Sequence, residues 1–227
     1  MGISVPKEGE VIASNPVWIQ LQVNGYPLGM GSQFDRQDEI AVSELGQTMH
    51  IVIDNRPYIA VNGPPLDPFY KDGFYYDSSY KFELPYSLSR GEHVIRVFPA
   101  RSYGESLKGE KMFAVQTFYV GQRIENPNID LKAPYLTYNE PSDLLYLTAQ
   151  KPVLLDFFIT NVTLSSDGYQ VKATLDKSTE RMISTWEPYY IYGLGKGKHT
   201  LRLQLVDERG RQVSGEFNDV TRSFTVH

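Results

Sequence analysis

The sequence predicts an all-β protein built from two tandem immunoglobulin-like β-sandwich domains. Three observations carry this prediction. Apolar and polar residues alternate along short runs, glycine and proline interrupt those runs, and several runs recur in the same order later in the chain. The chain has 227 residues, including 18 glycines and 14 prolines. At roughly 100–200 residues per domain, this length accommodates one large domain or two small ones.

Strand-like alternation is clearest in residues 17–23 and 200–206. In the first run every second residue is aliphatic, and the turn signal Asn24-Gly25 follows it. In the second run leucines alternate with polar residues, and a polar turn at residues 207–210 follows. A period of two places all the apolar side chains of a strand on one face, so we expect half-buried strands. Further strand candidates are residues 10–13, 93–98, 113–120, 144–147 and 223–226.

An internal repeat indicates two domains rather than one. Residues 88–97 match residues 194–203, with a leucine, a basic residue, a glycine, a histidine and an arginine in register. Residues 15–23 match residues 151–159, and the matched segments follow the same order in both halves. Repetition of this kind is the sequence signature of a duplicated structural unit.

The domain boundary is expected in a polar linker, residues 122–130, which contains an Asn-Pro breaker. The first domain then covers residues 1–121 and carries two insertions, at residues 30–44 and 64–76. The second domain covers residues 131–227. Each has about 95–120 residues and roughly seven strands, the usual size of an immunoglobulin-like sandwich.

Composition excludes several classes of function. The net charge of −5, from 22 Lys and Arg against 27 Asp and Glu, argues against nucleic acid, because phosphate binding needs a cationic face. The absence of cysteine excludes disulfides, thiolate zinc sites and a cysteine nucleophile. No apolar run approaches the ~20 residues that span a bilayer, so we expect no membrane-spanning segment.

The repeated positions resemble bacterial immunoglobulin-like or fibronectin-III-like modules, which occur in tandem on envelope and secreted proteins. The residues that carry the resemblance are Pro6-Lys7-Glu8-Gly9, Pro16-Val17, Gly91-Glu92-His93, Pro152-Val153, Gly197-Lys198-His199, Asp207-Glu208-Arg209-Gly210 and Phe224-Thr225-Val226. Residues 99–104 depart from the pattern in the first half, where they replace the Asp-Gly turn. The resemblance implies an extracytoplasmic location (periplasm, cell surface or secreted), with a signal peptide that is not part of this sequence; a cytoplasmic protein is the other interpretation. It implies no particular ligand, because sandwiches serve many functions.

No motif for catalysis or metal binding stands out. His93 and His199 are candidate ligands or bases, but their matched placement favours a structural role in which the ring packs on the sandwich end and hydrogen-bonds a loop. Residues 193–198 lack the Gly-Lys-Ser/Thr ending of a phosphate loop and precede a strand. Residues 35–39 could supply oxygen ligands for calcium, but they lack the EF-hand order, so a solvated charged loop is expected. We therefore expect no catalytic residue, no metal and no cofactor.

Aromatic residues are the strongest indication of a function. The candidate binding residues are Phe69, Tyr70, Phe74, Tyr75, Tyr76 and Trp186. All but Trp186 belong to the insertion at residues 64–76, whereas Trp186 belongs to a cluster that aligns with residues 80–86. Tyrosine and tryptophan combine an apolar body with a polar tip, which suits protein interfaces and sugar stacking. Aromatics also favour strands, so an ordered structural loop is an equal alternative.

The sequence therefore predicts a non-catalytic extracytoplasmic module, bacterial by resemblance, that mediates protein interaction or has a structural role. One alternative is a carbohydrate-binding module that uses exposed Tyr and Trp. Another is a pair of spacer domains in a larger envelope protein or enzyme. A hydrolase with an unrecognised site is the least supported, because no motif marks one. The expected partner is a protein or a glycan.

Overall fold

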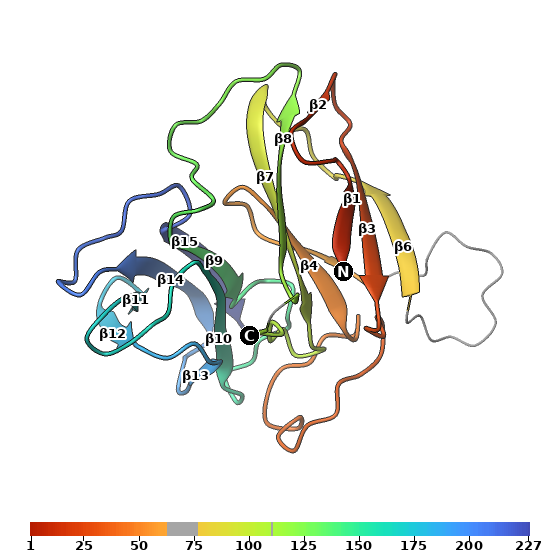
Figure 1. Cartoon of the computed structure of the whole chain (residues 1–227). Coiled ribbons are helices and arrows are strands. Elements are labelled where there is room, and N and C mark those ends of the chain that lie inside the picture. Colours follow the sequence, from red (N-terminus) through yellow and green to blue (C-terminus); the bar gives the residue numbers. More distant parts are fainter. Residues whose placement is uncertain (63–76, 110) are drawn as a thin grey trace. The chain divides into compact units, whose positions relative to one another are not determined.

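A computed structural model describes residues 1–62, 77–109 and 111–227 (Figure 1). These residues form fifteen strands and no helix, which confirms the all-β prediction. The chain divides into two compact units. Unit 1 contains Met1–Ser32, Leu45–Ser102 and Leu107–Pro127; unit 2 contains Gln33–Glu44, Tyr103–Ser106 and Asn128–His227.

Unit 1 is a sandwich of two sheets. Its strands are β1 (Gly2–Val5), β2 (Glu10–Ile12), β3 (Trp18–Asn24), β4 (Thr48–Ile53), β5 (Ile59–Val61), β6 (Asp77–Glu83), β7 (Gly91–Ala100) and β8 (Ala114–Val120). One sheet has the order β1-β3-β6 and the other β2-β8-β7-β4-β5. All neighbours are antiparallel except β2 and β8, which are parallel. Pro6 follows β1 directly, and a residue without an N–H ends the strand ladder there.

Unit 2 is a second sandwich of two sheets. Its strands are β9 (Tyr135–Glu140), β10 (Val153–Thr160), β11 (Gln170–Leu175), β12 (Thr179–Ile183), β13 (Tyr189–Ile191), β14 (Gly197–Val206) and β15 (Asp219–Val226). The sheet orders are β13-β10-β9 and β12-β11-β14-β15. The strand expected at residues 144–147 is reduced to a single parallel bridge between Leu147 and Val226. This bridge occupies the place that β2 has beside β8 in unit 1.

The two sandwiches have the same topology. Every strand of unit 2 has an equivalent in unit 1. In chain order, the seven strands β9 to β15 are equivalent to β1, β3, β4, β5, β6, β7 and β8. The matched segments 15–23 and 151–159 include the equivalent strands β3 and β10, and segments 88–97 and 194–203 begin β7 and β14. Two antiparallel sheets packed face to face, with strands exchanged between them in this order, define an immunoglobulin-like sandwich. The predicted fold class and the fold-level resemblance to fibronectin-III-like modules are confirmed.

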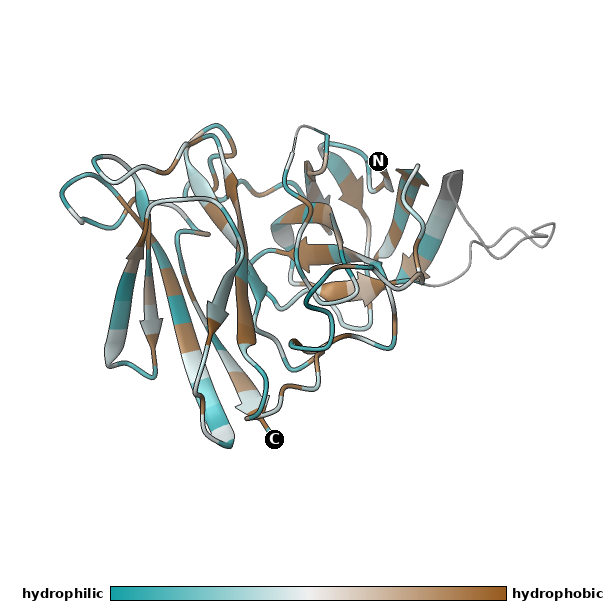
Figure 2. Cartoon of the chain, turned by 90° about the horizontal axis from the view of Figure 1, so that it is seen from below, coloured by the Kyte–Doolittle hydropathy of each residue, from teal (hydrophilic) through white to brown (hydrophobic). Residues whose placement is uncertain are grey.

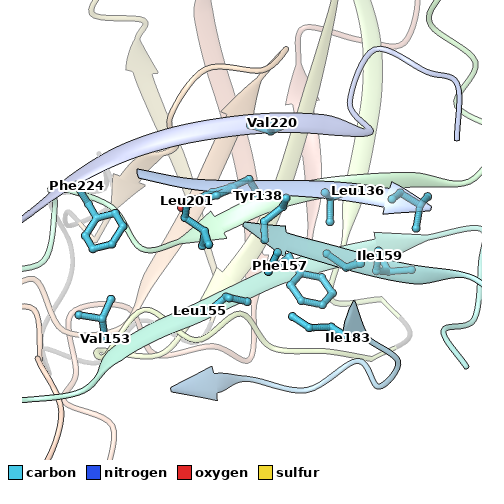
Figure 3. Close-up of a cluster of buried hydrophobic side chains, with 14 of the residues drawn as sticks. Leu136, Tyr138, Val153, Leu155, Phe157, Ile159, Ile183, Leu201, Val220 and Phe224 are labelled. Carbon is cyan, nitrogen blue, oxygen red and sulfur yellow. The ribbon is translucent and has the colours of Figure 1, made fainter. Parts of the chain in front are cut away.

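Alternating side chains fill the space between the sheets of each unit. Val17, just before β3, and Ile19 and Leu21 within it are 0% exposed, and Val23 is 2% exposed, as the alternation predicts. Each such aliphatic side chain contributes roughly 1.5–3 kcal/mol through burial. Figure 2 shows the hydrophobic and hydrophilic bands along the strands. Figure 3 shows the corresponding core of unit 2, which includes Leu155 and Phe157 of β10.

Strand β10 is buried on both faces, as β4 and β9 are. Its outward-facing Asp156 is 0% exposed and accepts hydrogen bonds from Ser106 and Asn139. The donors are the backbone N–H (3.1 Å) and hydroxyl (2.6 Å) of Ser106 and the side-chain amide of Asn139 (2.7 Å). These bonds join residues 103–106 to unit 2, and residues 33–44 also belong to that unit. The bounds predicted from the sequence place both segments in the first domain.

Candidate functional site

His93 lies near the start of β7 and joins three parts of unit 1. Its Nδ1 lies 2.8 Å from Oδ2 of Asp54, and its Nε2 lies 2.9 Å from the carbonyl oxygen of Ser89. The other carboxylate oxygen of Asp54 accepts the backbone N–H of Val94 at 3.0 Å. The ring packs on Phe118 with a centroid distance of 5.6 Å. We call this arrangement the His93–Asp54 pair.

His199 has the same surroundings near the start of β14 in unit 2. Its Nδ1 lies 2.8 Å from Oδ2 of Asp176, and its Nε2 lies 2.8 Å from the carbonyl oxygen of Gly195. Asp176 also accepts the backbone N–H of Thr200 at 2.8 Å, and the ring lies 5.6 Å from that of Phe224. In this His199–Asp176 pair, as in its counterpart, the ring packs in the sandwich and hydrogen-bonds a loop. The ring packing and the loop hydrogen bond expected of a structural histidine are present in both units.

These contacts favour the protonated form of both imidazoles. In His93 burial lowers the pKa, but the hydrogen bonds to Asp54 and to the Ser89 carbonyl outweigh it, so the pKa is raised overall. In His199 the hydrogen bond to Asp176 is the main cause of a raised pKa. Burial raises the pKa of Asp176, but the hydrogen bonds from His199 and Thr200 outweigh it and lower the pKa overall. Because both ring nitrogens face oxygen acceptors, neither is free to take a proton from a substrate.

The charged turn at residues 35–39 is exposed, as expected for a solvated loop. Arg36 and Glu39 form an ion pair within it, with Nη2 and Oε2 2.6 Å apart. Across the described residues, no three side chains of His, Asp or Glu lie together in a way that could hold a metal ion.

The predicted aromatic residues fall into two groups. Phe69, Tyr70, Phe74, Tyr75 and Tyr76 lie outside the described residues. Trp186 lies between β12 and β13 and is half-buried. Its Nε1–H donates to the carbonyl oxygen of Phe157 at 2.9 Å, and its ring packs edge-on against Phe158 with centroids 4.8 Å apart. The structure thus gives Trp186 a packing contact in unit 2, and a role in binding stays a prediction.

A cavity of about 630 Å³ lies in unit 2 between strands β12 and β13. Each of these strands is the last of its sheet, so the cavity opens along one side edge of the sandwich. We call it the edge groove and define it by six of its lining residues: Leu175, Arg181, Met182, Tyr190, Tyr192 and Leu194. Met182 is 47% exposed and Tyr192 is 64% exposed, unusually open positions for large apolar side chains.

Arg36, from the segment 33–44, covers part of the groove's tyrosine wall. Its Nη2 donates to the hydroxyl of Tyr192 at 2.8 Å, and its guanidinium carbon lies 5.4 Å from the centre of the Tyr190 ring. The pKa of Tyr190 is raised, chiefly by burial, so its hydroxyl stays protonated at neutral pH. These contacts orient two aromatic rings at the groove without closing it.

Sequence reasoning noticed the tyrosines at residues 189–192 but assigned part of that cluster to a repeated core. The groove could not be found in this way, because β12 and β13 are consecutive in sequence and yet belong to different sheets. One sequence feature did point to this edge: the connection between these two strands differs in length between the two halves of the chain. Residues 184–188 join β12 to β13, whereas residues 62–76 join the equivalent strands of unit 1.

No helix in the described parts of the chain is long and apolar enough to cross a membrane.

No protein-family model matches the chain, and no curated protein matches it. Among solved structures, it is similar to the Clostridium thermocellum CbhA fibronectin(III)-like modules, with 10% identity over 99% of this chain and 92% of that chain, at a TM-score of 0.31. It is also similar to dimeric latent PorU from Porphyromonas gingivalis, with 14% identity over 98% of this chain and 19% of that one, at a TM-score of 0.31. Chicken CNTN1 FN1-FN3 domains match with 10% identity over 99% and 64%, at a TM-score of 0.25. Because these identities and TM-scores are low, the fold assignment rests on the strand order of the two units.

The chain is therefore a pair of immunoglobulin-like sandwiches.

Proposed function

We propose that this protein is a non-catalytic module that binds another protein outside the cytoplasm, with the edge groove of unit 2 as the contact surface. One observation carries the proposal: an apolar groove of about 630 Å³ lies between two strands that end their sheets. The outer edge of such a strand has backbone N–H and C=O groups without a neighbouring strand. An extended segment of a partner can add to such an edge and place alternate side chains in the groove.

The histidines support a non-catalytic role. Imidazole is a common acid–base catalyst, and both ring nitrogens of His93 and of His199 are engaged by a carboxylate and a carbonyl. The same histidine contacts occur at equivalent positions in both units, as expected of a structural element. A location outside the cytoplasm is supported by the resemblance of the repeated segments to tandem modules of envelope and secreted proteins.

Trp186 supports a protein partner over a glycan. Stacking on a sugar needs an exposed aromatic face, and the indole of Trp186 is half-buried, with its N–H donated to the Phe157 carbonyl. The side chain of Tyr192 is exposed, but it lies beside aliphatic lining residues such as Leu175 and Leu194. Apolar side chains are better partners for that lining than sugar hydroxyls.

Peptide display tests this proposal. A library of unstructured peptides is selected on the full-length protein, and the selected peptides are measured against groove variants Met182→Glu and Tyr192→Ala. The matched controls are Leu144→Glu and Tyr146→Ala, because Leu144 (52% exposed) and Tyr146 (70% exposed) lie in unit 2 and do not line the groove. We expect the groove variants to lose about tenfold or more in affinity, and the controls to bind like the wild type.

The proposal fails if no peptide is selected or if the selected peptides bind the groove variants as tightly as the wild type. Unchanged tryptophan fluorescence and unchanged circular dichroism show that each variant is folded.

A further inference from the structure

Arg181 places an unneutralised positive charge on the edge groove. It lies in β12, lines the groove and is exposed. Its guanidinium donates only to the backbone carbonyl of Glu180, at 3.1 Å. The carboxylate of Glu180 is 2.7 Å from the ammonium group of Lys172 and is already paired. Among the described residues, then, Arg181 has no carboxylate partner.

Three exposed lysines, Lys177, Lys196 and Lys198, lie at one end of the same sandwich. The register places them together, because Leu175 pairs with Leu201 and the turn after β11 therefore lies beside the start of β14. No ion pair joins these lysines to a carboxylate in the described parts of the chain.

Two carboxylates near the groove are paired with cations. Asp176 is bonded to His199 and to Thr200, and Glu39 is paired with Arg36, the residue that contacts Tyr192. Glu187 accepts the hydroxyl of Thr185 at 2.9 Å and keeps its negative charge. Arg181 and the three lysines are cations with no ion pair in the described parts of the chain, although the whole chain carries a net charge of −5.

We infer that the edge groove recognises an extended segment of a partner protein in which aliphatic residues alternate with acidic ones. This inference rests on the proposed function and specifies the chemistry of the partner. In an extended segment successive side chains point to opposite faces, so alternate aliphatic residues enter the groove. The intervening carboxylates face the open side of the groove, and there they meet the exposed, flexible side chains of Arg181 and the lysines at its rim. A volume of about 630 Å³ is sufficient for a few aliphatic side chains.

Charge complementarity distinguishes this partner from a purely apolar one. Unpaired cations at the rim of an apolar surface attract acidic segments, speed their association and repel basic segments. Attraction between exposed charges is also screened by salt. The inference therefore predicts both an order of affinities and a salt dependence.

Three fluorescein-labelled peptides test it by fluorescence anisotropy with the full-length protein. All three have valine at alternate positions, and the intervening residues are glutamate, serine or lysine. We expect the glutamate peptide to bind about tenfold tighter than the serine peptide, and the lysine peptide to bind weakest. Raising the salt concentration is expected to weaken the binding of the glutamate peptide most.

Arg181→Glu is expected to reverse the order of the glutamate and lysine peptides, and Arg181→Gln to remove most of the difference. Arg209→Glu is the matched control, since Arg209 is a 70% exposed arginine of the turn after β14 and lies outside the groove. This control is expected to keep the wild-type order. Circular dichroism and tryptophan fluorescence verify that each variant is folded.

The outcomes separate the two proposals. If the three peptides bind equally and Met182→Glu abolishes binding of all three, the acidic preference is overturned and the groove remains the binding surface. If Arg209→Glu changes the order as much as Arg181→Glu, the preference belongs to the net charge of the chain and the inference is also overturned. If no peptide binds and the display selection fails as well, the proposed function is overturned with it.

Discussion

The His93–Asp54 pair and the His199–Asp176 pair have the same geometry in different surroundings. The Nδ1–Oδ2 distance is 2.8 Å in both. The exposed side-chain fractions differ: 5% for His93 and 28% for Asp54, against 14% for His199 and 43% for Asp176. A hydrogen bond to a charged group stabilises a fold most where water cannot replace it. The duplication has therefore kept the contacts, whereas burial determines how much free energy they contribute.

The arginines that follow these histidines diverge further. Arg96 in unit 1 is 1% exposed and donates from Nη2 to the backbone carbonyl of Asp54. Its counterpart Arg202 has a side chain that is 46% exposed, and it binds the carboxylate of Asp219, with Nε and Oδ1 2.7 Å apart. One repeated arginine is thus a buried side chain that supports a turn, and the other forms a surface ion pair.

The two tryptophans allow each unit to be followed in the full-length protein. Trp18 lies in unit 1 and Trp186 lies in unit 2, and the chain contains no other tryptophan. In a Trp186→Phe background the fluorescence reports the unfolding of unit 1, and in a Trp18→Phe background that of unit 2. The free energy of unfolding by urea can then be compared between equivalent positions.

Substitution of the two arginines is expected to give the largest difference. Arg96→Ala should destabilise unit 1 by about 3–4 kcal/mol, since it leaves a cavity and removes a donor to the part-buried carbonyl of Asp54. Arg202→Ala should cost unit 2 less than about 1 kcal/mol, because solvent screens an exposed ion pair. Urea unfolding in the two single-tryptophan backgrounds measures both values. Arg96→Met, which retains most of the side-chain volume, separates lost packing from the lost hydrogen bond. Equal losses in the two units would contradict the role assigned to burial.

Substitution of the two aspartates separates the effect of burial on stability from other differences between the two units. Asp54 and Asp176 both have positive φ, 51° and 47°, so alanine introduces the same backbone strain of roughly 1–2 kcal/mol in each unit. The remaining loss should be about 1–2 kcal/mol larger for Asp54→Ala, because it leaves His93 and the Val94 N–H buried without their acceptor. The same urea experiment measures this difference. Asn at either position tolerates positive φ and keeps one acceptor, so it should restore part of the stability; a larger loss at Asp176 would reverse the interpretation.

The pH dependence of stability is expected to be the smallest effect, and to have the same sign in both units. The folded-state pKa of His93 and of His199 is raised above the ordinary value of 6.5. Each pair therefore contributes its full stability below about pH 6.5, and the contribution is lost as the pH rises through the folded pKa. The lowered pKa of Asp176 acts at the other end, where its contribution is lost as the pH falls through that lowered value.

Urea unfolding measured between about pH 5.5 and pH 8.5 checks this expectation in each single-tryptophan background. His199→Gln should flatten the pH dependence of unit 2 and leave that of unit 1 unchanged, and His93→Gln should do the opposite. A wild-type unit that gains stability as the pH rises across this range would show that its imidazole is neutral in the fold.

Much of the fold could be predicted from local patterns. The alternation at Val17, Ile19, Leu21 and Val23 defined a buried strand face, and the matched histidines indicated two homologous units with structural rings. These features depend on neighbours a few residues apart or on comparison of one half with the other. The candidate site was less accessible, since the aromatic cluster at residues 69–76 lies outside the described residues and Trp186 packs against Phe158.

Sequence alone was sufficient for the strand class, the duplication and the pairing of each histidine with a loop, because periodicity and repetition are properties of the chain itself. Burial and membership of a unit required the folded structure. Asp156 lies in an apolar run, and two hydrogen bonds from Ser106, 50 residues away in the chain, offset the cost of its burial. The edge groove likewise arises from two strands in different sheets. Such features depend on distances between segments remote in sequence, which no local pattern records.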